Sequence, residues 1–290
     1  MGKKRRLSFA LTGLVTWLII AQFILKRRES DRCAKRKFSK KGITLLTKTI
    51  NARGIKLHYV QVGDDSLPTL FFIHGSPQSW NCFTEYLQDP GLGKQFRMIA
   101  VDRPGFGYTE FGNARDLDEQ AVIVSYLLQK KFNSKPFYLI GHSYGGALAV
   151  KLHLMNPGNI TGLILLAASI DPAAEKGASW RGIFSKTPFQ YLLPGAFRPS
   201  NEEMYYLKDD LDRLRRRLYK VTTPVWALHG TEDKIVPLRT VDFAKKEMKN
   251  TSVRIKILPG AGHFFLWDDE FEEVKTFLLG LEKEAVPDVN

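Results

Sequence analysis

The stretch GHSYGG, residues 141–146, decides the fold of this chain. An apolar, β-prone run at residues 136–140 precedes it, and a run with helical character at residues 147–155 follows it. The order is therefore strand, tight turn and helix, with Ser143 in the turn. Such a sharp turn forces a strained backbone conformation on the serine, and the flanking glycines let strand and helix pack closely. We expect the hydroxyl to stand clear of a sheet at a helix N-terminus, where developing negative charge is favoured.

Strands and helices alternate on both sides of this turn, over residues 43–281. Apolar β-prone runs predict eight strands, at residues 43–50, 55–62, 69–73, 97–101, 136–140, 160–168, 224–229 and 253–258. The alternation breaks at about residues 170–220, which are rich in Gly, Pro and aromatic residues and then in charge. We interpret this stretch as an insertion with a few helices. Alternating strands and helices indicate an α/β domain with a mostly parallel sheet that helices cover on both faces.

A serine hydroxyl needs a base to become a nucleophile, and that base needs an orienting acid. Of the six histidines, His263 stands in a Gly-rich loop after the last predicted strand. Asp233 follows the preceding strand in the same way, and Asp171, just after residues 160–168, is the alternative acid. Ligands of open α/β sheets gather outside the carboxyl ends of the strands, so we predict a triad of Ser143, Asp233 and His263. Without such partners, the glycine pattern alone would fit an ordinary turn.

Five segments occur in a family order: HGSP (74–77), DRPGFG (102–107), GHSYGG (141–146), HGTEDKIVP (229–237) and GAGH (260–263). With them the chain resembles the α/β-hydrolase superfamily, in its lipase/esterase-like branch with a lid inserted after the sixth strand. The resemblance covers about residues 43–281. It implies an eight-stranded, mostly parallel sheet, and a short helical lid at about residues 170–220. The triad order Ser, Asp, His is the one described for this fold.

The resemblance also implies further site residues. The oxyanion hole would be made by the backbone N–H groups of Ser76 and Tyr144, while Asp102 would brace its own loop. Relatives that open epoxides or remove halide carry an aspartate at the elbow, so Ser143 argues against both chemistries. The aromatic side chains of the lid give it an apolar inner face or fill its core, and we name three of them as substrate contacts: Trp180, Phe184 and Phe189.

The pattern of the amino-terminal segment predicts a membrane anchor. Residues 7–25 are uncharged and, as a helix, would reach about 28 Å, close to the roughly 30 Å of a hydrocarbon core. Basic clusters lie on both sides, in a tail at residues 1–6 and a linker at residues 26–42. A cleaved signal peptide and a twin-arginine export signal are the alternatives. We predict a retained single-pass anchor; the basic linker favours a cytoplasmic domain, whereas the basic tail opposes crossing.

The distribution of charge and the two cysteines argue against nucleic-acid binding, disulfide bonds and metal sites. Residues 1–41 hold 13 Lys/Arg and two acidic residues, and so carry almost all of the net charge of +13. The nearly neutral remainder, with a short tail at residues 282–290, argues against nucleic-acid binding. The two cysteines, Cys33 and Cys82, lie in different contexts, so we expect neither a structural disulfide nor a metal site. No cofactor is expected.

Together these features predict a membrane-anchored serine hydrolase that cleaves an ester or related acyl bond through an acyl-enzyme. Its substrate would be a small, hydrophobic acyl compound. An acyltransferase or perhydrolase would use the same triad with a different acceptor. A binding protein on the same fold would have lost catalysis, and such proteins usually lack a member of the triad.

Overall fold

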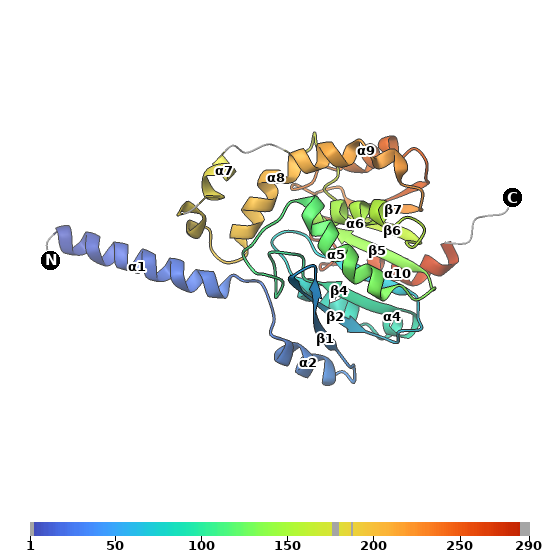
Figure 1. The fold of residues 1–290 in the computed structure, drawn as a ribbon, viewed down its shortest axis with the longest axis horizontal. Coiled ribbons are helices and arrows are strands. Elements are labelled where there is room, and N and C mark those ends of the chain that lie inside the picture. Colours follow the sequence, from blue (N-terminus) through green and yellow to red (C-terminus); the bar gives the residue numbers. More distant parts are fainter. Residues whose placement is uncertain (1–2, 176–179, 187, 285–290) are drawn as a thin grey trace.

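A computed structural model of the chain describes residues 3–175, 180–186 and 188–284. Figure 1 shows a sheet flanked by helices, with one long helix projecting from the domain. The strands are β1 (Leu46–Ala52), β2 (Ile55–Val62), β3 (Thr69–Ile73), β4 (Arg97–Val101), β5 (Phe137–His142), β6 (Gly162–Leu166), β7 (Val225–Gly230) and β8 (Val253–Leu258). The α-helices are α1 (Lys3–Ile24), α2 (Asp31–Ser39), α3 (Thr84–Leu87), α4 (Pro90–Gln95), α5 (Leu117–Lys131), α6 (Tyr144–Met155), α7 (Trp180–Phe184), α8 (Phe197–Arg215), α9 (Thr240–Glu247) and α10 (Phe271–Glu284). Short 3-10 turns are η1 (Trp80–Phe83), η2 (Phe189–Leu192) and η3 (Leu218–Lys220).

All eight strands form one sheet, in the order β1-β2-β4-β3-β5-β6-β7-β8. Strands β1 and β2 form the predicted hairpin, and β2 also pairs antiparallel with β4. Every pairing from β4 to β8 is parallel. The carboxyl ends of these parallel strands therefore meet at one edge of the sheet, and the predicted fold class is confirmed.

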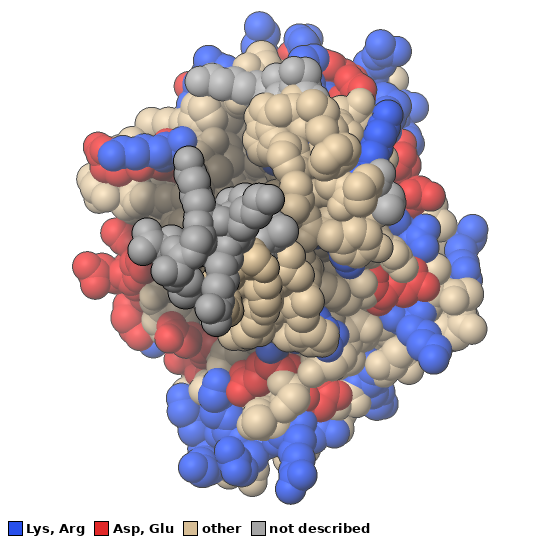
Figure 2. All heavy atoms as spheres, turned by 90° about the vertical axis from the view of Figure 1, so that its left-hand side faces the viewer, with Lys and Arg blue, Asp and Glu red and all other residues tan. Residues whose placement is uncertain are grey.

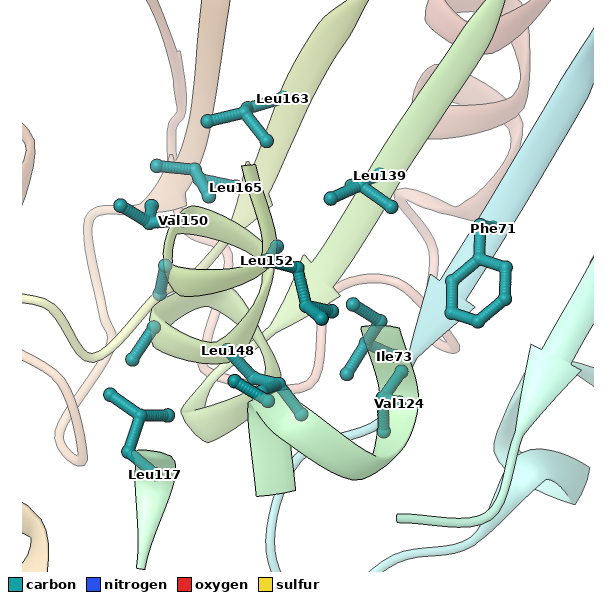
Figure 3. Packing of buried hydrophobic residues seen from close by; sticks show 14 of the residues in the cluster. Phe71, Ile73, Leu117, Val124, Leu139, Leu148, Val150, Leu152, Leu163 and Leu165 are labelled. Carbon is teal, nitrogen blue, oxygen red and sulfur yellow. The ribbon is translucent and has the colours of Figure 1, made fainter. Parts of the chain in front are cut away.

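Apolar side chains pack on both faces of the sheet because successive residues of a strand point to opposite sides. In β3, Phe71 and Ile73 face the cluster formed with α5, α6, α8 and α9. Figure 3 shows part of this cluster, in which Leu148 and Leu152 of α6 reach toward the sheet. Leu70 and Phe72 face the opposite cluster, formed with α2, η1, α3, α4 and α10. A central strand buried on both faces explains why residues 69–73 are continuously apolar.

The insertion after β6 is helical, as predicted, and we call residues 170–220 the lid. Helix α7 and η2 leave large side chains exposed, whereas the longer α8 buries Leu207, Leu211 and Leu214 against the domain core. Helix α8 thus belongs to the packed domain as much as to the lid.

Residues 7–25, predicted as a membrane anchor, lie within α1 and its end. Side chains are described for residues 8–9 and 12–24 of this helix. Among the described residues, no helix is long and apolar enough to span a bilayer. The predicted transmembrane part of the fold is therefore not supported. The end of α1 instead contacts the lid: the Gln22 amide donates to the carbonyls of Tyr191 and Leu193, and Ala196 N–H donates to Leu25 O.

The basic linker predicted at residues 26–42 contains α2, which begins after Ser30 and buries Ala34 and Phe38. Figure 2 views the face from which α1 projects; one group of Lys and Arg lies at its lower edge, at the height of α2 in Figure 1, and others lie along the top and the right. The basic residues of α2 thus lie outward while its apolar side joins the core. Of the predicted terminal tails, residues 1–2 and 285–290 lie outside the described residues.

Candidate active site

Ser143 occupies the sharp turn between β5 and α6. Its φ is 52° and its ψ is −122°, a conformation that a residue with a side chain rarely adopts. A Cβ at Gly141 would lie 2.3 Å from Gly145 O, and a Cβ at Gly145 would lie 2.2 Å from Ile73 O. Strand and helix therefore approach too closely for any residue but glycine. The strained serine expected from the sequence is present at the carboxyl edge of the sheet.

His263 and Asp233 meet at the same edge, in the loops after β8 and β7. The Nδ1 atom of His263 lies 2.7 Å from Oδ2 of Asp233, whose side chain is fully buried. The other carboxylate oxygen of Asp233 accepts the backbone N–H groups of Ile235 and Val236, each at 2.8 Å. These two bonds fix the carboxylate and leave Oδ2 for the imidazole. A carboxylate held in this way selects the tautomer of His263 that carries its proton on Nδ1 and leaves Nε2 free to accept one.

Asp233 stays ionised in this environment. Burial raises the pKa of its carboxyl group, but hydrogen bonds from His229 and His263 lower it more, so that the net shift is downward. His229 supports the same turn, because its Nε2 lies 2.9 Å from Val236 O and 3.3 Å from Asp233 Oδ2. The negative charge is thus available to stabilise a protonated His263.

The alternative acid, Asp171, is placed elsewhere. Its carboxylate accepts the N–H of Ala173 at 2.9 Å and lies 3.6 Å from the guanidinium of Arg239. Asp233 is the carboxylate that contacts His263.

His142, the residue before the nucleophile, brings His263 to the elbow. Its Nε2–H donates to His263 O at 3.1 Å, and the centroids of the two rings are 4.9 Å apart. Burial is the main reason why the pKa of His142 falls to about 3, so this ring is neutral. The Ser143 hydroxyl makes no hydrogen bond to any described residue; such bonds are often long without substrate and tighten in the complex. Ser143 and His263 are 8% and 6% exposed, so each keeps only a small accessible surface.

The loop after β3 lies directly against Ser143. A Cβ at Gly75 would come within 3.0 Å of the Ser143 Cβ and 2.9 Å of His142 Nδ1. The backbone N–H of Ser76 donates to no described residue, and the N–H of Tyr144, at the first position of α6, has no partner within its helix. Both N–H groups predicted for an oxyanion hole therefore lie close to the nucleophile and have no such partner, and their role in binding an oxyanion stays a prediction.

Three buried polar residues that the sequence reading missed lie behind these donors: Arg103, Gln120 and Glu203. The guanidinium of Arg103 pairs with the carboxylate of Glu203, and Gln120 bonds to both Glu203 and the Tyr144 hydroxyl. Arg103 follows Asp102, which braces its loop as expected by accepting the N–H groups of Trp80 and Tyr108. A charged residue within the turn-forming DRPGFG segment was the available signal for Arg103, but Glu203 lies in a charged stretch typical of a solvated helix.

The predicted substrate contacts lie on the lid. Trp180 and Phe189 are about half exposed, and the rings of Trp180 and Phe184 contact each other with centroids 6.0 Å apart. Phe189 lines a groove of about 470 Å³ together with Tyr205 and Tyr206 of α8. No described contact joins these aromatic side chains to the triad, and their role in substrate binding stays a prediction. Among the described residues, no group of His, Cys, Asp or Glu is arranged to hold a metal ion.

The chain is similar to known proteins in sequence. The model of the alpha/beta hydrolase family matches residues 70–276, which is most of the chain. Human monoglyceride lipase is 24% identical over 228 residues, covering 67% of this chain and 74% of the lipase. An uncharacterized hydrolase of Saccharomyces cerevisiae is 34% identical over 113 residues, and the chain spans only 38% of its length; for epoxide hydrolase 3 of Xenopus tropicalis that share is 31%.

The fold is also found in solved structures. An esterase from Exiguobacterium antarcticum superposes with a TM-score of 0.63 at 20% identity, covering 82% of this chain and all of the esterase. At this identity the similarity to the esterase shows a shared fold only. The match to the family model is what assigns the sequence to a family. The strand order, the serine elbow and the family match agree, and the chain belongs to the alpha/beta hydrolase family.

Proposed function

We propose that the protein is a serine hydrolase that cleaves carboxylic esters or closely related acyl bonds through an acyl-enzyme. The observation that carries this proposal is the contact of 2.7 Å between His263 Nδ1 and the buried Asp233, beside a strained Ser143. The esterase and lipase relatives support it, because their names describe acyl-bond hydrolysis. An aspartate-based epoxide opening lacks its nucleophile here.

In the proposed reaction each of these groups has one role. His263 Nε2 takes the proton of the Ser143 hydroxyl while the oxygen attacks the substrate carbonyl, and Asp233 stabilises the imidazolium that forms. The negative oxygen of the tetrahedral intermediate is bound by the N–H groups of Ser76 and Tyr144. His263 then gives its proton to the leaving alcohol, and the acyl group remains on Ser143. Water, activated by the same imidazole, releases the acid in the second half of the reaction.

The substrate we propose is a hydrophobic acyl compound. Its support is the apolar character of the lid, where Trp180 and Phe189 leave large ring surfaces exposed near the groove beside α8. A panel of p-nitrophenyl esters of increasing acyl length would show rising kcat/KM with length for such an enzyme. A steady preference for acetate over longer chains would argue against this substrate class.

The decisive variant is Ser143→Ala, compared with Ser125→Ala as a matched control. Ser125 is also buried, but its hydroxyl bonds to Asn156 between α5 and α6, on the face of the sheet and not at its carboxyl edge. We expect Ser143→Ala to lose about 10⁴-fold or more in kcat, because removing a triad member leaves only binding and oxyanion stabilisation. Ser125→Ala should keep its activity. Equal ester hydrolysis by Ser143→Ala and the unmodified protein would refute the assignment.

A further inference from the structure

We infer that Arg103 is a positioning residue that holds both oxyanion donors in place and makes their position depend on the lid helix α8. The inference rests on the proposed function, since it concerns the same oxyanion hole. It assigns a role in the reaction to two residues, Arg103 and Glu203, that make no hydrogen bond or ion pair with the triad.

The guanidinium of Arg103 is fully buried at the carboxyl edge of the sheet. Its Nε–H donates to His74 O at 2.8 Å, and one terminal nitrogen donates to Gly75 O at 3.2 Å. These are the carbonyls of the two residues before Ser76, so they set the direction of the peptide that carries the Ser76 N–H. The backbone N–H of Arg103 also donates to His74 Nε2 at 3.0 Å, while His74 Nδ1 lies 2.7 Å from Gly75 O. The loop is therefore fixed by one residue through three separate bonds.

The second donor is held from the same side. The central carbon of the guanidinium lies 4.4 Å from the centroid of the Tyr144 ring. Gln120, which accepts a hydrogen bond from Arg103 at 2.8 Å, donates to the Tyr144 hydroxyl at 3.0 Å. Arg103 thus lies between the two residues whose N–H groups form the oxyanion hole. A shift of its side chain would move both donors relative to each other.

The lid supplies the charge that keeps Arg103 in this place. Glu203 of α8 is fully buried and accepts both terminal nitrogens of Arg103, at 2.6 and 3.0 Å. One turn earlier on α8, Ser200 accepts a hydrogen bond from the Ser76 hydroxyl at 2.7 Å. Helix α8 therefore contacts the oxyanion loop directly, through Ser76, and indirectly, through the buried ion pair.

Only arginine can make this set of contacts. Its planar fork supplies five N–H donors in fixed directions, whereas the ammonium group of lysine is a compact point charge with three. Arg103→Lys should keep the charge that pairs with Glu203 but lose the simultaneous bonds to the carbonyls of His74 and Gly75. The variant separates the positioning of the loop from the presence of a buried cation.

The matched control is Arg97→Lys. Like Arg103, Arg97 is buried and donates several hydrogen bonds: two of its nitrogens donate to Thr69 Oγ1, and one also donates to Lys131 O. It differs in lying at the opposite end of β4. For Arg103→Lys we expect kcat to fall by about 10- to 100-fold, because a misplaced oxyanion donor costs up to that much. The KM should stay within about threefold, since the ground-state carbonyl gains little from the hole. Arg97→Lys should lose as much thermal stability as Arg103→Lys but keep kcat within about twofold of the unmodified protein.

Two further measurements separate positioning from stability. A trifluoromethyl ketone with the acyl chain of the substrate forms an oxyanion on Ser143, and its affinity should fall by the same factor as kcat/KM in Arg103→Lys. In the double variant Arg103→Met/Glu203→Leu, an apolar pair replaces the ion pair, a change that often leaves stability intact. We expect this variant to be folded and at least as slow as Arg103→Lys. Normal kcat in the folded double variant, or an equal loss of kcat in Arg97→Lys, would overturn the inference.

The failure of this inference is distinguishable from the failure of the proposed function. Hydrolysis by Ser143→Ala would remove the proposed function itself, and the oxyanion hole with it. An inactive Ser143→Ala together with a fully active Arg103→Lys would leave the serine hydrolase in place and refute the role of Arg103 alone.

Discussion

Replacing Asp233 by asparagine should change the tautomer of His263, moving its proton from Nδ1 to Nε2. We expect this change to abolish turnover while the fold persists. In the structure, Asp233 Oδ1 accepts the N–H groups of Ile235 and Val236, and Oδ2 faces His263 Nδ1. Only the carbonyl oxygen of an asparagine could accept the two backbone donors. Its NH₂ group would therefore point at His263 Nδ1, which would have to act as an acceptor. The proton of the imidazole would then sit on Nε2, where it blocks transfer from Ser143.

The magnitude follows from the tautomer. A triad in which asparagine forces the wrong tautomer loses about 10⁴ in kcat, equivalent to about 5 kcal/mol of transition-state stabilisation. The fold should persist, because the two backbone bonds and the volume of the side chain are kept, although the stabilisation that comes with the lowered pKa of Asp233 is lost. The assay is steady-state hydrolysis of a p-nitrophenyl ester at pH 8, with thermal unfolding of the same samples.

The control is Asp171→Asn, at the other carboxylate that follows a neighbouring strand. Asp171 bonds to Ala173 N–H and pairs with Arg239, so its loss should change kcat by less than about threefold. If Asp233→Asn kept more than about a tenth of the wild-type kcat, the reasoning from tautomers would be wrong. A larger loss in Asp171→Asn than in Asp233→Asn would point to the other acid.

Two predictions concern the scaffold of the site. Gly145→Ala places a Cβ 2.2 Å from Ile73 O, and the overlap should cost about 1–3 kcal/mol or more in thermal unfolding; an unchanged Tm would show that β3 and α6 have more room than the structure gives them. Burial alone would lower the pKa of His58, but the carboxylates of Asp102 and Asp31 raise it overall above its ordinary 6.5. The resulting stability is present below pH 6.5 and is lost as the pH rises through the raised pKa, so His58→Gln should cost more unfolding free energy at pH 6 than at pH 9 in urea titrations. An equal cost at both pH values would contradict the ion pairs of His58.

Much of the fold could be predicted because each central strand is buried on both faces. Residues 69–73 and 97–101 are short apolar runs, and β3 and β4 have these same bounds. The triad could be placed for a related reason: loops that follow neighbouring parallel strands must open at the same edge. Asp233 and His263 come after β7 and β8, and strand pairing alone brings them together.

Other features depend on contacts between residues far apart in the chain. Arg103 and Glu203 are 100 positions apart, and Glu203 precedes a run of charged residues that resembles a solvated helix face. Only the packing of α8 against α5 and α6 shows that this acid is buried. Helix α2 lies in the segment predicted as a basic linker. Its sequence does not indicate a packed helix, because only two apolar residues, Ala34 and Phe38, pack on the core among many basic ones.

The uncharged segment at residues 7–25 also makes contacts that its hydropathy does not predict. Its length and flanking charges fit a membrane anchor, and the structure indeed makes a helix there. Its last turn, however, donates and accepts hydrogen bonds through Gln22 to the lid at Leu193 and Gly195. The partners of this polar side chain depend on how the lid folds, and the sequence pattern alone does not specify them.

The central claim is that Ser143 carries the acyl group, and trapping that group tests it most directly. The protein is mixed with a slowly deacylating p-nitrophenyl ester, quenched in acid, digested and analysed by mass spectrometry. The account predicts one acyl adduct per chain, on the hydroxyl of Ser143 and absent from Ser143→Ala. Turnover of the ester by the unmodified protein with the acyl group on another residue, or with none trapped on Ser143, would contradict it.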